Sequence, residues 1–234
     1  MPDDRHPAPR QTAALLCLAL LAGCSALPGG NARAPSRTST SQASGALPAA
    51  RSGEEAQCLS GLSEMGARYS LLPDRYLGDG CTNLGTVQLS ALTTDTESLT
   101  ITNIGPVTCA VSTVFAGWAR FGVDRAAHQV FGKGLHTIET FGSYSCRNVA
   151  GSSRRSGHAT ATAIDVAAFV LDDGRRIVVK QDWNGGSSQA REFLRLVRTS
   201  ACRRFATVLS PDYNAAHEDH LHIEGVISGS SYCR

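Results

Sequence analysis

The chain has 234 residues, a formal net charge of +2 and 42% hydrophobic residues. This length suits one domain with additional segments or at most two small domains, and the hydrophobic content excludes disorder throughout. Charged residues make up only 18% and form no block of one sign, which excludes a protein that coats nucleic acid. The eight cysteines are many for a cytosolic enzyme of this size and raise the question of compartment.

The N-terminus predicts a secreted and lipidated protein. Arg5 and Arg10 precede an apolar run of about ten residues, which is too short for a permanent membrane-spanning helix. The run ends in the sequence LAGC, which resembles a bacterial lipobox, so residues 1–24 are expected to be a lipoprotein signal peptide and lipobox with lipidation at Cys24. By the same resemblance, Ser25 in place of an aspartate favours the outer membrane, facing the periplasm. The alternative is an ordinary cleaved signal peptide with an incidental cysteine.

The composition changes after the lipobox. Residues 25–56 are rich in Ser, Ala, Pro, Gly and Thr without a hydrophobic period, which predicts a disordered tether. Residues 57–234 are then expected to form a single domain, long enough for one sizeable core.

The cysteines of this domain predict disulfides. Cys17 leaves with the signal peptide and Cys24 carries lipid, and an even number remains for an oxidising compartment. They are Cys58, Cys81, Cys109, Cys146, Cys202 and Cys233. Among the pairings that the sequence leaves open, we expect 58–81, 109–146 and 202–233, because these close the shortest loops. No C-x-x-C occurs, so a cysteine zinc site is not expected.

Hydrophobic periodicity predicts an α+β domain, in which helices flank a small antiparallel sheet stabilised by the disulfides. The expected elements, in chain order, are a helix over 109–120, strands over 135–141 and 163–171, a turn at Asp173-Gly174, a return strand over 176–181, a helix over 187–205 capped by Ser187 or Ser188, and short strands over 206–209 and 220–225.

Two segments carry residues suited to metal binding. The first is SGHATATAID, from Ser156 to Asp165, and the second is HEDHLH, from His217 to His222. Histidine and aspartate are zinc ligands, and three protein ligands with one open position define a catalytic zinc site. Either segment alone is weak evidence, since an H-x-H on an exposed strand is often without function, but together they predict a metal site on the sheet.

Strand geometry supports this prediction. Alternate residues of a strand share a face, so His220, His222 and Glu224 are expected to point together while the intervening residues enter the core. Asp165 lies between Ile164 and Val166, where a carboxylate is costly to bury unless it is paired or bound to a cation.

The first segment resembles the S-x-H-x-x-G-x-A-x-D motif of D-alanyl-D-alanine carboxypeptidase zinc enzymes, which share a fold with lysostaphin-type peptidases and the hedgehog signalling domain. More closely, the chain from about Cys58 onward is similar to the bacterial extensin-like C-terminal domain family. The stretches that carry this resemblance are GSYSCR (142–147), SGHATATAIDVAAF (156–169), LSPDYNAAHEDHLHIE (209–224) and the closing Cys233-Arg234.

The resemblance implies roles for individual residues. His158, Asp165 and His222 match the zinc ligands. Asp219 lies where the carboxypeptidases carry a glutamate general base. His220 matches the first histidine of the lysostaphin-type H-x-H, which is expected to stabilise the transition state, and His220 is the alternative to Asp219 as the base. The remaining implied catalytic residue is Arg147, which would polarise the scissile carbonyl or hold the substrate carboxylate.

Two departures from the motif bear on activity. Ala161 replaces a glycine, a mild change if the backbone angle there is ordinary. Asp219 is shorter than glutamate by one methylene, and a shift of about 1 Å in a base costs on the order of 100-fold in rate. The second departure puts peptidase activity in doubt more than metal binding.

The expected function is therefore a zinc-dependent peptidase acting on peptidoglycan peptides, attached to the membrane through the lipid on Cys24, with Zn²⁺ and no organic cofactor. The alternatives are a non-catalytic wall-binding module and a zinc hydrolase for another periplasmic peptide. Five residues are expected to be structural or solvent-facing, although one of them, His217, is also a candidate for orienting a metal ligand. The five are Trp118, Trp183, His128, His136 and His217.

Overall fold

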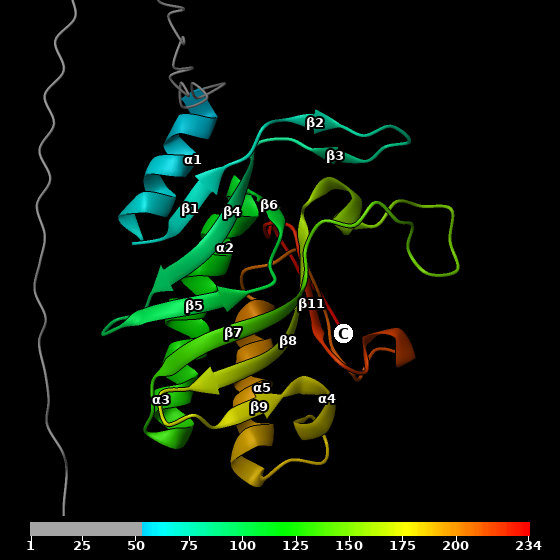
Figure 1. Cartoon of the computed structure of the whole chain (residues 1–234). Helices are drawn as coiled ribbons and strands as arrows, with labels where there is room; N and C mark the ends of the chain where they lie inside the picture. The colour runs from blue at the N-terminus through cyan, green and yellow to red at the C-terminus, as the bar shows by residue number, and fades with distance from the viewer. Residues whose placement is uncertain (1–52) are drawn as a thin grey trace, which may run out of the picture. The chain divides into compact units, whose positions relative to one another are not determined.

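A long mixed β-sheet runs through residues 53–234, the part of the chain that the computed structural model describes (Figure 1). The strands are β1 (Arg68–Leu71), β2 (Arg75–Tyr76), β3 (Thr82–Asn83), β4 (Thr86–Thr93), β5 (Ser98–Thr102), β6 (Pro106–Thr108), β7 (Leu135–Gly142), β8 (Ala163–Leu171), β9 (Arg176–Val178), β10 (Thr207–Leu209), β11 (Leu221–Glu224) and β12 (Tyr232–Cys233). Within the described residues, ten of these strands form one sheet in the order β1-β4-β5-β7-β8-β11-β10-β12, with β6 on β4 and β9 on β8, while β2 and β3 form a separate hairpin.

The sheet confirms the α+β class and corrects the predicted size and direction. It is not small, and two of its pairs, β5 with β7 and β10 with β12, are parallel. The strands before residue 109 were not predicted, because most of them are short or have few apolar residues at alternate positions.

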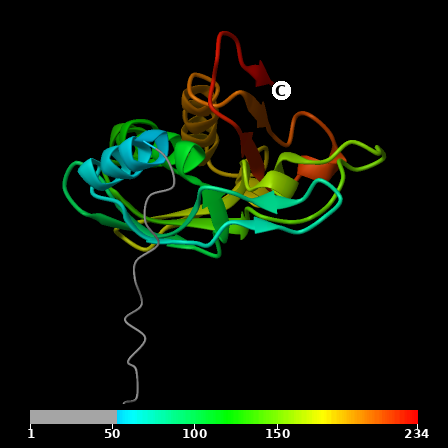
Figure 2. The same cartoon turned by 90° about the horizontal axis from the view of Figure 1, so that it is seen from above.

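Helices cover one face of the sheet (Figures 1 and 2). The helical elements are α1 (Gly53–Glu64), α2 (Cys109–Trp118), the π-helical turn η1 (Ala119–Asp124), α3 (Arg125–Phe131), the 3₁₀ turn η2 (Gly157–Thr160), α4 (Val179–Asp182), α5 (Ser188–Ala201) and the 3₁₀ turn η3 (Ala215–His217). The core lies between the sheet and α2 and α5, where Trp118 packs edge-on against Phe169 and Phe205. Trp118 and Trp183 are both buried, as expected, and His128 and His136 are solvent-facing.

Several predicted boundaries move. The helix predicted over 109–120 ends as α2 at Trp118 and continues as η1, and Ser187 caps α5 by accepting a hydrogen bond from Ala190 N at 3.1 Å. The return strand stops at Val178, because the chain turns into α4 there. At the N-terminal end, α1 begins at Gly53, so the last residues of the predicted tether are helical.

Three disulfides link distant segments of the domain. The pairs are Cys58–Cys109, Cys81–Cys146 and Cys202–Cys233. The prediction was right for 202–233 and wrong for 58–81 and 109–146. Closeness in sequence is a weak guide to which cysteines pair, because the entropy cost of closing a loop grows slowly with its length. Instead α1 packs on α2, and the β2–β3 hairpin lies against the segment after β7, which places the cysteines together.

None of the helices in residues 53–234 has the length and apolar character needed to cross a membrane. The predicted signal peptide, Cys24 and residues 25–52 of the tether lie outside the described part of the chain.

Candidate metal centre

The predicted zinc ligands meet where β8, β11 and η2 converge. Asp165 on β8 and His222 on β11 are direct partners in the antiparallel pairing of these strands. Their strand neighbours Ile164 and Ile223 enter the core, so the alternation places the two ligands on the opposite face of the sheet. His158 comes from η2, whose first turn is capped by the Ser156 hydroxyl.

The three side chains have the spacing of a zinc site. His158 Nε2 lies 3.1 Å from Asp165 Oδ2, His222 Nδ1 lies 2.9 Å from Asp165 Oδ1, and the two ring nitrogens are 3.2 Å apart. Ligand atoms about 2.0–2.1 Å from a tetrahedral zinc ion lie roughly 3.3 Å from one another. These donor atoms therefore fit zinc, and all three ligands are largely buried.

Both histidines have a partner that fixes their tautomer. His158 Nδ1 donates to the backbone oxygen of Ser143, which leaves the lone pair of Nε2 toward Asp165. His222 Nε2 donates to Glu224 Oε2 at 3.0 Å, which leaves the lone pair of Nδ1 on the same side. Histidines that bind metals are typically oriented in this way by a carbonyl or carboxylate on the other ring nitrogen.

Sequence reasoning assigned no role to Ser143 or Glu224. Ser143 lies in the stretch GSYSCR, which ends at Arg147. Its hydroxyl donates to Pro106 O at 2.6 Å and so holds the Ser143 backbone, whose carbonyl oxygen accepts from His158 Nδ1. Glu224 was predicted to share a strand face with His220 and His222, and this alternation could have indicated its contact with His222. Gly157 makes room for Glu224, because a Cβ at residue 157 would lie 2.4 Å from Glu224 Cδ.

Ala161 does not have an ordinary backbone angle. Its φ of 55° and ψ of 30° are left-handed, the conformation that glycine adopts without cost. The substitution of alanine for the glycine of the motif is therefore not mild, and it costs on the order of 1 kcal/mol.

The charges at the centre stabilise each other. Burial raises the pKa of Asp165, but the imidazoles of His158 and His222 beside the carboxylate outweigh this effect and hold the pKa well below its ordinary value. Burial lowers the pKa of His222, whereas its hydrogen bonds to Asp165 and Glu224 raise it, with a net pKa of about 9. The hydrogen bond from His222 also lowers the pKa of Glu224. Without a metal ion, this pKa of about 9 keeps His222 protonated at pH 7.

Asp219 and His220 lie next to the three ligands but outside that set. His220 Nδ1 donates to Asp219 Oδ1 at 2.7 Å, and His220 Nε2 lies 3.3 Å from Asp165 Oδ1. The carboxylate of Asp219 is thus hydrogen-bonded to His220 and not to the three ligands. Arg147 also reaches the centre, with Nη2 3.9 Å from Asp165 Oδ2.

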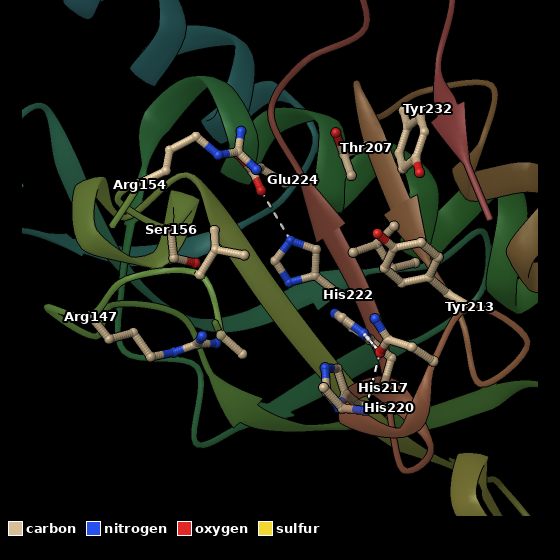
Figure 3. A pocket seen from close by; sticks show the side chains of 15 residues that line it. Arg147, Arg154, Ser156, Thr207, Tyr213, His217, His220, His222, Glu224 and Tyr232 are labelled. Atoms are coloured by element: carbon tan, nitrogen blue, oxygen red, sulfur yellow. Dashed lines mark hydrogen bonds and ion pairs between the residues drawn. The ribbon is translucent and has the colours of Figure 1, made fainter. Parts of the chain in front are cut away.

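A cavity of about 420 Å³ lies beside the centre, and of the three ligands His222 lines it (Figure 3). His220, His222 and Glu224 all line it, which confirms that they share one face. His217 lines it too, with its ring centroid 5.2 Å from that of His220. Burial, with the nearby His220 and His222, lowers the pKa of His217 to about 4, so this ring is neutral at pH 7. His217, His220 and His222 form a second group close enough to bind a metal ion.

The fold and the site define a disulfide-bonded α+β domain with a buried His-Asp-His group beside an open cavity. Residues 56–234 match the family described as Extensin-like protein C-terminus. Because the match covers more than half of the sequence, the chain belongs to this family. No curated protein and no solved structure matched the chain.

Proposed function

We propose that this protein is a zinc-dependent peptidase, of carboxypeptidase or endopeptidase type, that acts on peptidoglycan peptides at the cell envelope. One observation carries the proposal. The lone pairs of His158 Nε2 and His222 Nδ1 and the carboxylate of Asp165 converge at zinc spacing beside a cavity that a peptide can enter.

The ligand count favours a catalytic site over a structural one. Structural zinc sites have four protein ligands, whereas catalytic sites have three and keep one position for water or substrate. His220 is separate from the His158-Asp165-His222 group, so that group supplies three ligands. The next side chains around it, His217, His220 and Arg147, are polar and line the cavity.

The surrounding residues have the chemistry of peptide hydrolysis. Zinc, when bound, supplies a Lewis acid and lowers the pKa of a water to about 7. His220 is the general base in this scheme: its Nδ1–H is held by Asp219, so Nε2 accepts a proton from the attacking water and transfers it to the leaving amine. Arg147 donates to the carbonyl oxygen that becomes negative, or to a terminal carboxylate of the peptide.

The position of Asp219 supports a second candidate, a wall-binding module that keeps the fold and the metal without turnover. The resemblance places a base carboxylate at this residue, yet the side chain is 40% exposed and hydrogen-bonded to His220. In this second function no group at residue 219 would act on water directly, and the cavity would serve for binding.

One preparation of residues 25–234 separates the two candidates. Its zinc content is measured, and its action on digested cell-wall peptides is followed by mass spectrometry with and without chelator. Cleavage that the chelator abolishes and zinc restores supports the peptidase. One equivalent of zinc with no product from any muropeptide supports the binding module, and cleavage that survives His158→Ala contradicts the proposed site.

We also propose that the domain is held at the outer membrane by lipid on Cys24, facing the periplasm. The support is the LAGC sequence after a short apolar run. A palmitate analogue is expected to label the wild-type protein and not Cys24→Ala. Equal labelling of the two proteins would contradict the anchor.

A further inference from the structure

Two arginines line the cavity, one with a long ion-pair contact and one with no ion pair in residues 53–234. Arg147 and Arg154 both belong to its wall. Within residues 53–234, Arg147 has its nearest ion-pair contact with Asp165 at 3.9 Å, and the Arg154 guanidinium has no carboxylate oxygen within ion-pair distance. Arg155, the next residue, differs: it donates to Asn148 Oδ1 at 2.9 Å and to the backbone oxygen of Asp79.

The loop that carries both cavity arginines is held in place. Ser156 N donates to Arg147 O at 3.2 Å and Val149 N donates to Arg154 O at 2.9 Å, so residues 147–156 form a small hairpin. The Cys81–Cys146 disulfide fixes its start, and Arg155 ties its end to the β2–β3 hairpin. The backbone of Arg154 is therefore positioned before any ligand binds, which reduces the entropy cost of binding.

Glu224 is the carboxylate neighbour of Arg154, whose charge contributes to the lowered pKa of Glu224 although no ion pair joins the two side chains. In Figure 3 its guanidinium lies near Glu224, on the same side of His222 as Arg147, while Tyr213 and Tyr232 lie on the other side. The Glu224 carboxylate is already bonded to His222 Nε2 at 3.0 Å. Glu224 is also the single carboxylate among the cavity-lining residues of the described chain, against two arginines. The cavity therefore favours an anionic ligand.

We propose that Arg154 binds a carboxylate of an acidic peptide, at a subsite separate from the metal centre. This inference rests on the proposed function and adds the class of ligand: a peptide with a free carboxylate on an internal residue. Arg147 reaches the metal-ligand group, so it serves the reacting bond or the chain terminus. Arg154 lies beyond Glu224 and meets a residue further along the peptide. A guanidinium suits this role because it binds a carboxylate through two parallel hydrogen bonds.

Binding of matched peptides to the full chain, purified in detergent and loaded with zinc, tests the subsite. The probes are two synthetic stem peptides that differ at one internal D-glutamate, which carries either its free carboxylate or a carboxamide. Calorimetry in a His220→Gln background slows cleavage of the probes, so that binding is measured. The acidic peptide is expected to bind about 10- to 100-fold more tightly than the amide, the range of a hydrogen bond to a charged group.

Three variants give the expected pattern. Arg154→Gln is expected to abolish the preference for the acidic peptide, and Arg154→Lys to retain a part of it. Arg203→Gln, which removes an exposed arginine after α5, is the matched control and is expected to keep the full preference. A wild-type preference that persists in Arg154→Gln would overturn the subsite, and so would an equal loss in Arg203→Gln. Arg154→Lys guards against misfolding, since a partial preference in this variant shows that the loss in Arg154→Gln comes from the missing charge and not from a change of fold.

The readout is separate from the proposed hydrolysis. If wild-type protein cleaves no muropeptide but shows the Arg154-dependent preference, the peptidase fails and the subsite stands. If cleavage occurs with equal affinity for the acidic and amide peptides, the subsite fails and the peptidase stands.

Discussion

Asp219 and His220 form a carboxylate–imidazole pair in which His220 Nδ1 lies 2.7 Å from Asp219 Oδ1 and His220 Nε2 lies 3.3 Å from Asp165 Oδ1. The pair turns one ring nitrogen toward the ligand group and fixes its tautomer through the other. In the proposed peptidase this geometry assigns proton transfer to His220 and orientation of its ring to Asp219.

Replacing His220 tests that division. His220→Gln is expected to lower muropeptide cleavage by about 10²- to 10⁴-fold, the usual contribution of a general base, while zinc content stays at one equivalent. Asp219→Asn is expected to lower it by only about 10- to 100-fold, because it disturbs the orientation of the base without removing it. Steady-state rates and metal analysis of both variants check this. A larger loss for Asp219→Asn than for His220→Gln would assign the base to Asp219.

Glu224 is expected to control zinc affinity. Glu224→Gln replaces the carboxylate that accepts from His222 Nε2 with a neutral amide, so the imidazole becomes a weaker and less oriented ligand. Loss of such a partner typically weakens metal affinity by about 10- to 100-fold. Competition with a zinc-binding dye measures the effect. Glu192→Gln, an exposed carboxylate on α5, is the control, and equal affinity of the two variants would remove Glu224 from the site.

Gly157→Ala is expected to reduce zinc affinity by a different route. The added Cβ would lie 2.4 Å from Glu224 Cδ and 2.5 Å from Glu224 Oε1, so the glutamate must move away from His222. We expect this variant to resemble Glu224→Gln in the same dye competition. The double variant should then lose little more than either single one, because the two changes break one interaction. Additive losses would show that Gly157 acts elsewhere.

The pH dependence of stability should differ between the metal-free and zinc-loaded protein. The pKa of His222 rises from 6.5 to about 9 in the folded state, so its protonation stabilises the metal-free protein fully below pH 6.5 and no longer above pH 9. The shift corresponds to about 3 kcal/mol. Zinc needs the deprotonated nitrogen, so the rise in Tm on adding zinc should grow across the same window.

Thermal unfolding at pH 6.5, 7.5 and 9, with zinc and with chelator, measures both effects. His222→Gln is the control, because it should flatten the pH dependence of the metal-free protein and remove the zinc effect. A zinc-induced Tm rise that shrinks as the pH increases would contradict the assignment of His222 as a ligand.

The Cys81–Cys146 disulfide should matter for both stability and the cavity. Mass spectrometry of non-reduced peptides is expected to show the pairs 81–146 and 58–109 rather than 58–81 and 109–146. Replacing Cys81 and Cys146 together by serine should lower the free energy of unfolding by about 2–5 kcal/mol in denaturant titrations. Because Arg147 follows Cys146 directly, the double variant should also weaken peptide binding. Unchanged binding would show that the backbone hydrogen bonds alone fix the loop.

Local pattern determined much of the site in advance. The alternation in LHIE placed His222 and Glu224 on one face of a strand, and the apolar neighbours of Asp165 marked it as a buried carboxylate in β8. The bounds of β8 were predicted residue for residue, because a long apolar strand with a clear turn after it depends little on its surroundings.

Tertiary structure decided what joins these segments. The register of β8 on β11 pairs Asp165 with His222. The alternation within each strand cannot predict this register, because it says nothing about how two strands align. Local sequence also did not predict the hydrogen bond between His158 and the Ser143 carbonyl, the hydrogen bond between His220 and Asp219, or two of the three disulfides. The sequence by itself therefore determined which residue types face one side of each strand, since side-chain direction follows from backbone geometry. Which of them touch, and which lone pair is free for a metal, depends on packing between segments far apart in the chain.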